Sequence, residues 1–142
     1  MPSATDFPAT GKVIEVRDGL VVFQPAGSTY ELHLTTATPY TGPVNQQVEG
    51  YIRVKARKVY TVPSGGNFIT PIQGPTRIIQ GRVRYVDNTT LVLHAAAPVI
   101  VELPGDDRQI ELSEGQITTG KMANVLGFPG AAFELAAAQI AR

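Results

Sequence analysis

Apolar and polar residues alternate with a period of two along much of this chain. Residues 30–34 alternate cleanly and residues 12–16 form another such run, which is typical of strands that bury one face. Residues 20–23 follow the 12–16 run as a short, β-rich apolar run. Asp18 and Gly19 separate the first two runs, and Asp-Gly between two such runs is a strong hairpin signal. The beginning of the sequence therefore predicts three consecutive short strands.

A loop and a second group of strands are predicted next. Residues 35–47 are rich in Thr, Pro and Gly, which favours a loop. A long strand is predicted over residues 50–62, followed by a turn at residues 64–67 and a short strand over residues 68–72. Pro71 has no amide hydrogen to donate to a neighbouring strand, so we expect this last strand to end there or to lie at an edge.

The same order of strands and turns begins again 70 residues later. Residues 81–86 mirror residues 11–16, and residues 91–93 fall on residues 21–23. A fixed internal period, where one is present, reflects the architecture of the protein. The sequence therefore predicts two similar halves.

The predicted fold class is all-β, with two tandem five-stranded antiparallel barrels over residues 1–74 and 75–142. About five short strands in some seventy residues usually close into a barrel, because closure removes exposed edges. We expect the barrels to be OB-like or SH3-like, and a single sandwich made jointly by both halves is the alternative. The one helix candidate is the alanine-rich stretch at residues 131–142, since alanine favours helix most.

The apolar positions of the alternating runs predict the hydrophobic core. Hydrophobic residues make up 43% of the sequence, which is a normal share for a globular protein, so disorder is not expected. The predicted core residues are Val13, Val16, Val22, Leu32, Leu34, Ile52, Val54, Val83, Val86, Val92, Val101 and Leu103.

Composition excludes several classes of function. The sequence has no cysteine, which removes disulfides, thiolate metal sites and cysteine nucleophiles. The 12 basic and 12 acidic residues give a formal net charge of zero, which argues against a dedicated polyanion binder. The sequence shows neither a signal-peptide pattern nor the roughly 18 apolar residues that span a bilayer. We therefore expect a cytoplasmic protein without a membrane partner.

Charge is distributed unevenly along the chain. Residues 1–49 carry two basic and five acidic groups, residues 50–86 carry seven basic groups and no acidic group, and residues 87–142 carry three basic and seven acidic groups. Acidic residues of the last segment could face the basic segment, within one chain or between copies associated head to tail. These acidic residues are Glu102, Asp106, Asp107, Glu111 and Glu114.

Six residues of the basic segment are candidate binding residues, because alternate positions of a strand share one face. Small barrels bind single-stranded nucleic acid on such cationic faces, where phosphates pair with Arg or Lys and bases stack on aromatic rings. The alternative interpretation is a solvated strand face, or one that pairs with acidic residues of the other half, since exposed Lys and Arg also protect sheet edges. The candidates are Tyr51, Arg53, Lys55 and Arg57 on one strand, and Arg82 and Arg84 on another.

The sequence contains no recognisable catalytic, metal-binding or phosphate-binding constellation. His33 and His94 are single residues without a second ligand at metal spacing. Asp106 and Asp107 follow Pro-Gly, which is first of all a turn. We therefore expect a protein that is not an enzyme and that uses no cofactor or metal.

Residues 11–19 resemble the opening hairpin of many small barrels. In length and two-fold repeat the chain is similar to tandem molybdate-binding barrel proteins. Their characteristic Ser-Ala-Arg-Asn opening is missing from both halves, so oxyanion binding is not expected.

Two functional hypotheses remain. The first is a non-enzymatic binding or assembly module that acts through protein contacts, including self-association. The alternative is an OB-like barrel that binds single-stranded nucleic acid through its basic strand. An enzyme with an active site between the two halves is a distant third.

Overall fold

The structure is a computed structural model that describes residues 3–136. It is an all-β protein with twelve strands in one mixed sheet. The helical structure of these residues is limited to two 3-10 turns, η1 (Ala4–Asp6) and η2 (Asp107–Gln109). No helix there is long and apolar enough to cross a membrane. The strands are β1 (Ala9–Arg17), β2 (Leu20–Pro25), β3 (Glu31–Thr35), β4 (Gln47–Val62), β5 (Phe68–Thr70), β6 (Gln73–Pro75), β7 (Ile78–Val86), β8 (Thr90–His94), β9 (Pro98–Glu102), β10 (Ile110–Glu111), β11 (Met122–Gly127) and β12 (Ala132–Leu135).

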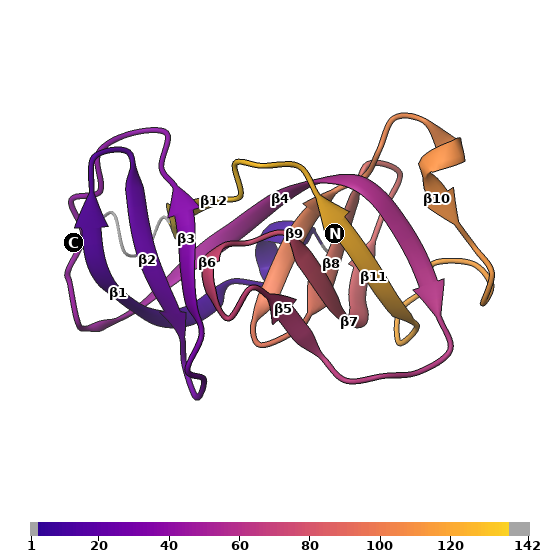
Figure 1. Ribbon diagram of the computed structural model, residues 1–142, viewed down its shortest axis with the longest axis horizontal. Coiled ribbons are helices and arrows are strands. Elements are labelled where there is room, and N and C mark those ends of the chain that lie inside the picture. Colours follow the sequence, from indigo (N-terminus) through magenta and orange to yellow (C-terminus); the bar gives the residue numbers. More distant parts are fainter. Residues whose placement is uncertain (1–2, 137–142) are drawn as a thin grey trace.

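Strand β4 runs through the whole sheet (Figure 1). It has 16 residues, which corresponds to roughly 50 Å of extended chain. Its residues 47–50 pair with β1 and residues 50–53 with β12, both antiparallel. Its residues 53–55 pair with β9 in parallel, and residues 56–62 pair with β11 antiparallel.

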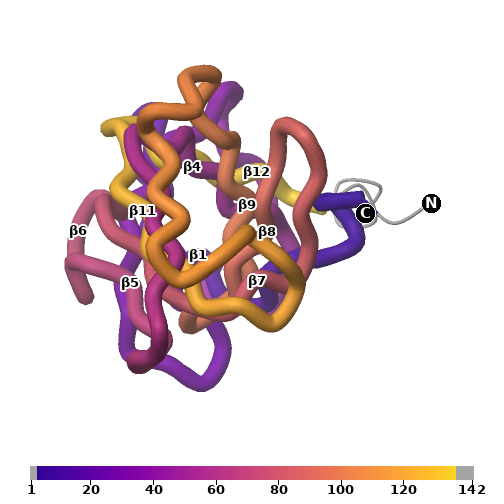
Figure 2. The backbone as a smooth tube through the Cα atoms, turned by 90° about the vertical axis from the view of Figure 1, so that its right-hand side faces the viewer, coloured from indigo at the N-terminus to yellow at the C-terminus, as the bar shows by residue number. Residues whose placement is uncertain are grey.

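These pairings close two five-stranded rings that share β4. The first ring contains β1, β2, β3, β12 and β4. The second contains β4, β9, β8, β7 and β11, and Figure 2 shows its strands arranged around a common centre. Each ring is thus completed by a strand from the other half of the sequence, and among residues 3–136 neither half closes a ring with its own strands alone.

Both rings contain strands from before and after the predicted domain boundary between residues 74 and 75. One contiguous core cluster contains residues from before and after it, such as Phe23 and Phe133. The rings of these two phenylalanines lie 4.8 Å apart between centroids. The division into two domains stays a prediction, because shared strands and a shared core do not locate a boundary.

The hairpins β1–β2 and β7–β8 have the same register 70 positions apart. A bulge follows Val13 in the first hairpin and Val83 in the second. Gly11 and Gly81 occupy matching positions, where a Cβ atom would overlap the backbone of the opposite strand. Both positions therefore require glycine for the close approach of the two strands.

The helix predicted over residues 131–142 is wrong for the part that the structure describes. Residues 132–135 form β12, which pairs with β4, and Phe133 packs on Phe23. A short alanine-rich segment gains little from its helical propensity, so tertiary pairing decides its conformation. The rest of that prediction lies outside the described residues.

Most of the predicted core is confirmed. Val16 is the exception, because it lies at the end of β1 beside the hairpin turn and remains 42% exposed. Val86 and Leu103 are partly buried against the core. The buried members are Val13, Val22, Leu32, Leu34, Ile52, Val54, Val83, Val92 and Val101.

Because both rings share β4, we expect a single cooperative unfolding transition. Leu32→Ala in the first ring and Leu93→Ala in the second should each lower the free energy of unfolding by about 2–5 kcal/mol and should move the same transition. Urea unfolding followed by far-UV circular dichroism and by tyrosine fluorescence measures this. Two separate transitions, each moved by only one of the variants, would contradict the prediction.

Candidate functional site

The outward face of β4 carries exposed cations at alternate positions. Arg53, Lys55 and Arg57 are exposed, Tyr51 beside them is half-buried, and the residues between these four are buried. The predicted orientation of this strand is therefore confirmed. The face extends from the first ring onto the second.

A bulge lengthens this row by one cation. The pairing of β4 with β11 shifts register, so that Ala56 and Lys58 have partners and Arg57 between them has none. The burial pattern changes phase at this point: Ala56 is buried before it and Val59 after it. Lys58 thus joins the outward face, and we call Arg53, Lys55, Arg57 and Lys58 the cationic row. The sequence analysis did not include Lys58 in this face, because strict alternation does not continue from Arg57 to Lys58.

Acidic residues from the second half neutralise two members of the cationic row. Arg53 Nη2 lies 3.2 Å from Glu134 Oε1, and Lys58 Nζ lies 3.0 Å from Glu111 Oε1. The hydrogen bond to Glu111 raises the pKa of the Lys58 ammonium. Within residues 3–136, Lys55 and Arg57 form no ion pair within 4.0 Å. The two pairs are partly solvated, so each adds little stability.

Two tyrosines of β4 are already engaged by the row. Arg53 Cζ lies 5.8 Å from the ring centroid of Tyr51, and Lys58 Nζ lies 5.3 Å from that of Tyr60. Both distances suit cation–π attraction. The Tyr51 hydroxyl also donates a hydrogen bond of 2.9 Å to the carbonyl oxygen of Thr5. The aromatic ring of each tyrosine therefore has a cation from β4 itself over one of its faces.

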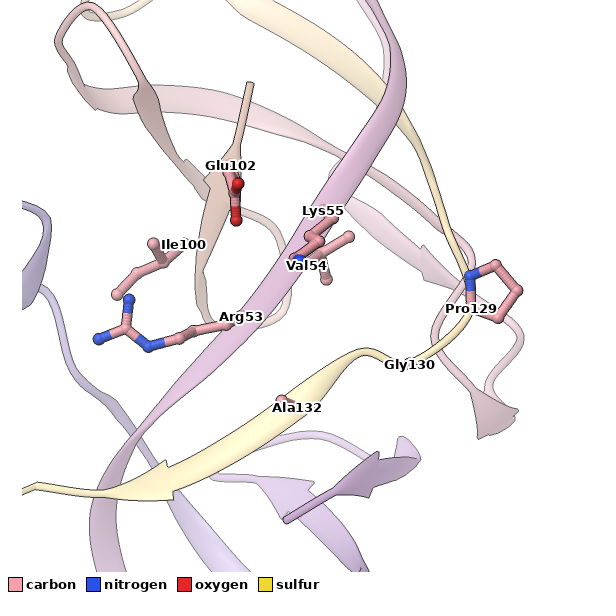
Figure 3. A pocket seen from close by; sticks show the side chains of 8 residues that line it. All are labelled: Arg53, Val54, Lys55, Ile100, Glu102, Pro129, Gly130 and Ala132. Carbon is pink, nitrogen blue, oxygen red and sulfur yellow. The ribbon is translucent and has the colours of Figure 1, made fainter. Parts of the chain in front are cut away.

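A groove of about 370 Å³ lies where β4 passes between β9 and the segment before β12. Figure 3 shows Ile100 and Glu102 on one side of β4, and residues 129–132 on the other. Arg53 is the register partner of Ile100, and Lys55 is that of Glu102. The groove thus combines apolar walls with both signs of charge. Its lining residues are Arg53, Val54, Lys55, Ile100, Glu102, Pro129, Gly130 and Ala132.

An exposed phenylalanine stands next to this groove. The Phe128 amide donates a hydrogen bond of 2.8 Å to the Lys55 carbonyl oxygen, and the residue is 47% exposed. The chain reaches this position because Gly127 has no side chain: a Cβ atom there would lie 2.7 Å from Val54 Cγ1. The sequence analysis did not single out Phe128. The available signal was a large aromatic residue in the turn-like sequence Gly-Phe-Pro-Gly at residues 127–130.

Arg82 and Arg84 do not join the cationic row. Arg82 pairs with Met122 of β11, which in turn pairs with Val62 at the far end of β4. The Arg82 guanidinium donates to the Gly120 carbonyl oxygen at 2.9 Å. Arg84 is exposed beside β8, where burial and then the Arg84 charge lower the pKa of His94. The six candidate residues therefore form two separate sets.

An N-terminal strap, residues 3–8, covers the outer face of the second ring beside the groove. Val92 and Ile100 alternate with core residues and so face outward, yet they are 0% and 4% exposed. The strap's η1 contacts β8, and the ring of Phe7 lies 6.2 Å from that of Tyr85 between centroids. With the Tyr51–Thr5 hydrogen bond, these contacts place the strap beside β8 and next to Tyr51 of β4.

Neither metal-binding side chains nor comparisons with known proteins assign a function to this site. Among residues 3–136, no group of three or more His, Asp or Glu side chains is arranged to hold a metal ion. The chain matches no protein-family model, and no curated protein or solved structure matches it. The geometry of the groove and of the cationic row is therefore the basis for a functional proposal.

We expect the strap to contribute stability through Phe7. Phe7→Ala should lower the free energy of unfolding by about 1–3 kcal/mol, which is less than for a fully buried phenylalanine, and should increase binding of an apolar dye to the uncovered Val92 and Ile100. The matched control is Phe128→Ala, whose exposed side chain should change the free energy by less than about 0.5 kcal/mol. Equal effects of the two substitutions in urea unfolding would contradict this role of the strap.

Proposed function

We propose that this protein is a non-enzymatic binding module that acts through protein contacts at the groove beside Lys55. The observation that carries the proposal is the exposed Phe128 next to a groove with apolar and charged walls. Protein interfaces are enriched in aromatic residues and arginine, and a few such residues supply most of the binding energy. Arg53 lines the groove, and the exposed Phe128 directly precedes Pro129 of the groove lining.

We also propose the finer architecture that suits such a module. The two rings are small barrels, OB-like or SH3-like, related by an internal repeat of about 70 residues. The common register of the two hairpins, with bulges after Val13 and Val83, supports the repeat. The protein acts in the cytoplasm without a cofactor.

A photo-crosslinking residue placed at position 128 tests the protein-contact function. It should capture a partner, or a second copy of the chain, that the same residue at position 72 does not capture. Ile72 is a suitable control because it is 63% exposed and lies outside the groove. Light scattering of the purified chain identifies the case in which the partner is another copy.

The captured protein, prepared separately, should bind the full chain in a way that depends on Phe128. Phe128→Ala should weaken the affinity about tenfold or more, as expected for an aromatic residue central to an interface, whereas Ile72→Ala should leave it unchanged. Equal capture at both positions, or an affinity that does not respond to Phe128→Ala, rules out this groove as the interface.

The second candidate function is binding of single-stranded nucleic acid along the cationic row. It is favoured by four cations on successive outward positions of one strand, with tyrosines at both ends. Binding of a labelled oligonucleotide, measured by fluorescence anisotropy, should then weaken steeply with added salt, because phosphate contacts release counterions. The double variant Arg53→Glu with Lys55→Glu should abolish it, and unchanged binding would eliminate this surface.

A further inference from the structure

We infer that the partner of the groove is an extended peptide segment with acidic side chains at two alternate positions and an apolar side chain at the next alternate position, so that all three lie on one face of the peptide. This inference rests on the proposed function and specifies its ligand. It follows from the spacing of the unpaired cations, from the apolar groups beside them, and from the carboxylates that flank them.

The spacing of the two unpaired cations fits an extended chain. Lys55 and Arg57 share the outward face of β4 and form no ion pair within residues 3–136. Residues two apart on a strand are about 7 Å apart. Alternate side chains of an extended peptide have the same spacing, so two acidic side chains can pair with both cations at once. Such charge complementarity fixes the register of a complex.

The apolar groups beside Lys55 provide a place for the apolar side chain at the next alternate position of the peptide. Phe128 follows Gly127 on the chain that flanks β4, and its amide bonds to the Lys55 carbonyl oxygen. Pro129, Ala132 and Ile100 continue this surface into the groove. An apolar residue that packs here loses contact with water, which supplies affinity that exposed ion pairs alone do not give.

Carboxylates at the groove favour a peptide over a nucleic acid. Glu102 is the register partner of Lys55, and Glu134 pairs with Arg53. A phosphate backbone that follows the cationic row would pass both negative charges, and like charges in contact are costly. A phosphate backbone carries a charge at every unit, whereas this peptide carries negative charge only opposite Lys55 and Arg57. The neutral backbone of the peptide has amide hydrogens that can donate to Glu102.

Fluorescence anisotropy with the full chain and three labelled probes tests the inference. The probes are the peptide Ser-Leu-Thr-Glu-Thr-Glu-Gly, the same peptide with lysine in place of glutamate, and an oligo(dT) strand. We expect the acidic peptide to bind most tightly and more weakly as salt is added. Lys55→Glu with Arg57→Glu should weaken its binding about tenfold or more. The control Lys12→Glu with Lys121→Glu changes the net charge by the same amount at positions outside the groove, and it should leave the affinity for the acidic peptide unchanged.

Three results would overturn the inference: equal or tighter binding of the lysine peptide, acidic-peptide binding that is insensitive to Lys55→Glu with Arg57→Glu, or tighter binding of the oligonucleotide through these two residues. The proposed function fails by a different result, the loss of a Phe128-dependent crosslink. A crosslinked partner without acidic-peptide binding therefore rejects the acidic ligand alone.

Discussion

The backbone of β4 is the constraint on which the rest of this structure depends. Buried peptide groups need hydrogen-bond partners, and a strand of 16 residues is too long to find them all within one five-stranded ring. Strands from both halves of the chain therefore line its two edges: β1, β9 and β10 on one, β12 and β11 on the other. The two rings and their common core follow from this pairing.

The same continuity explains the electrostatics of the candidate site. Four of the seven cations of the basic segment lie on one face of β4, and all the strands that flank it except β1 come from the acidic second half. Glu134 and Glu111 are thereby brought to Arg53 and Lys58, whereas Lys55 keeps only Glu102 as a neighbour in register. The surface is consequently a mixed groove and not a uniform basic track, and this distinction separates the two functional proposals.

Period-two patterning was enough to predict most strands and the outward face that holds Arg53, because alternation depends only on local geometry. It could not predict where β12 pairs or that Phe128 stands beside Lys55, since both depend on contacts between residues far apart in sequence. It also left Lys58 out of this face, because the position of a bulge depends on the opposite strand. The strap at residues 3–8 gave no periodic signal, since it packs through a few side chains.

The exchange of closing strands affects how the chain can reach this structure during synthesis. Strands β1 to β3 of the first ring are synthesised before the strands of the second half, yet this ring closes only when β12 joins β3 and β4. Thr35 and Ala132 are register partners separated by about two thirds of the sequence, and such distant pairs slow folding because a large loop must close first. Until then the open edge of β4 is available to other strands. The ring whose strands are synthesised first is thus the ring that is completed last.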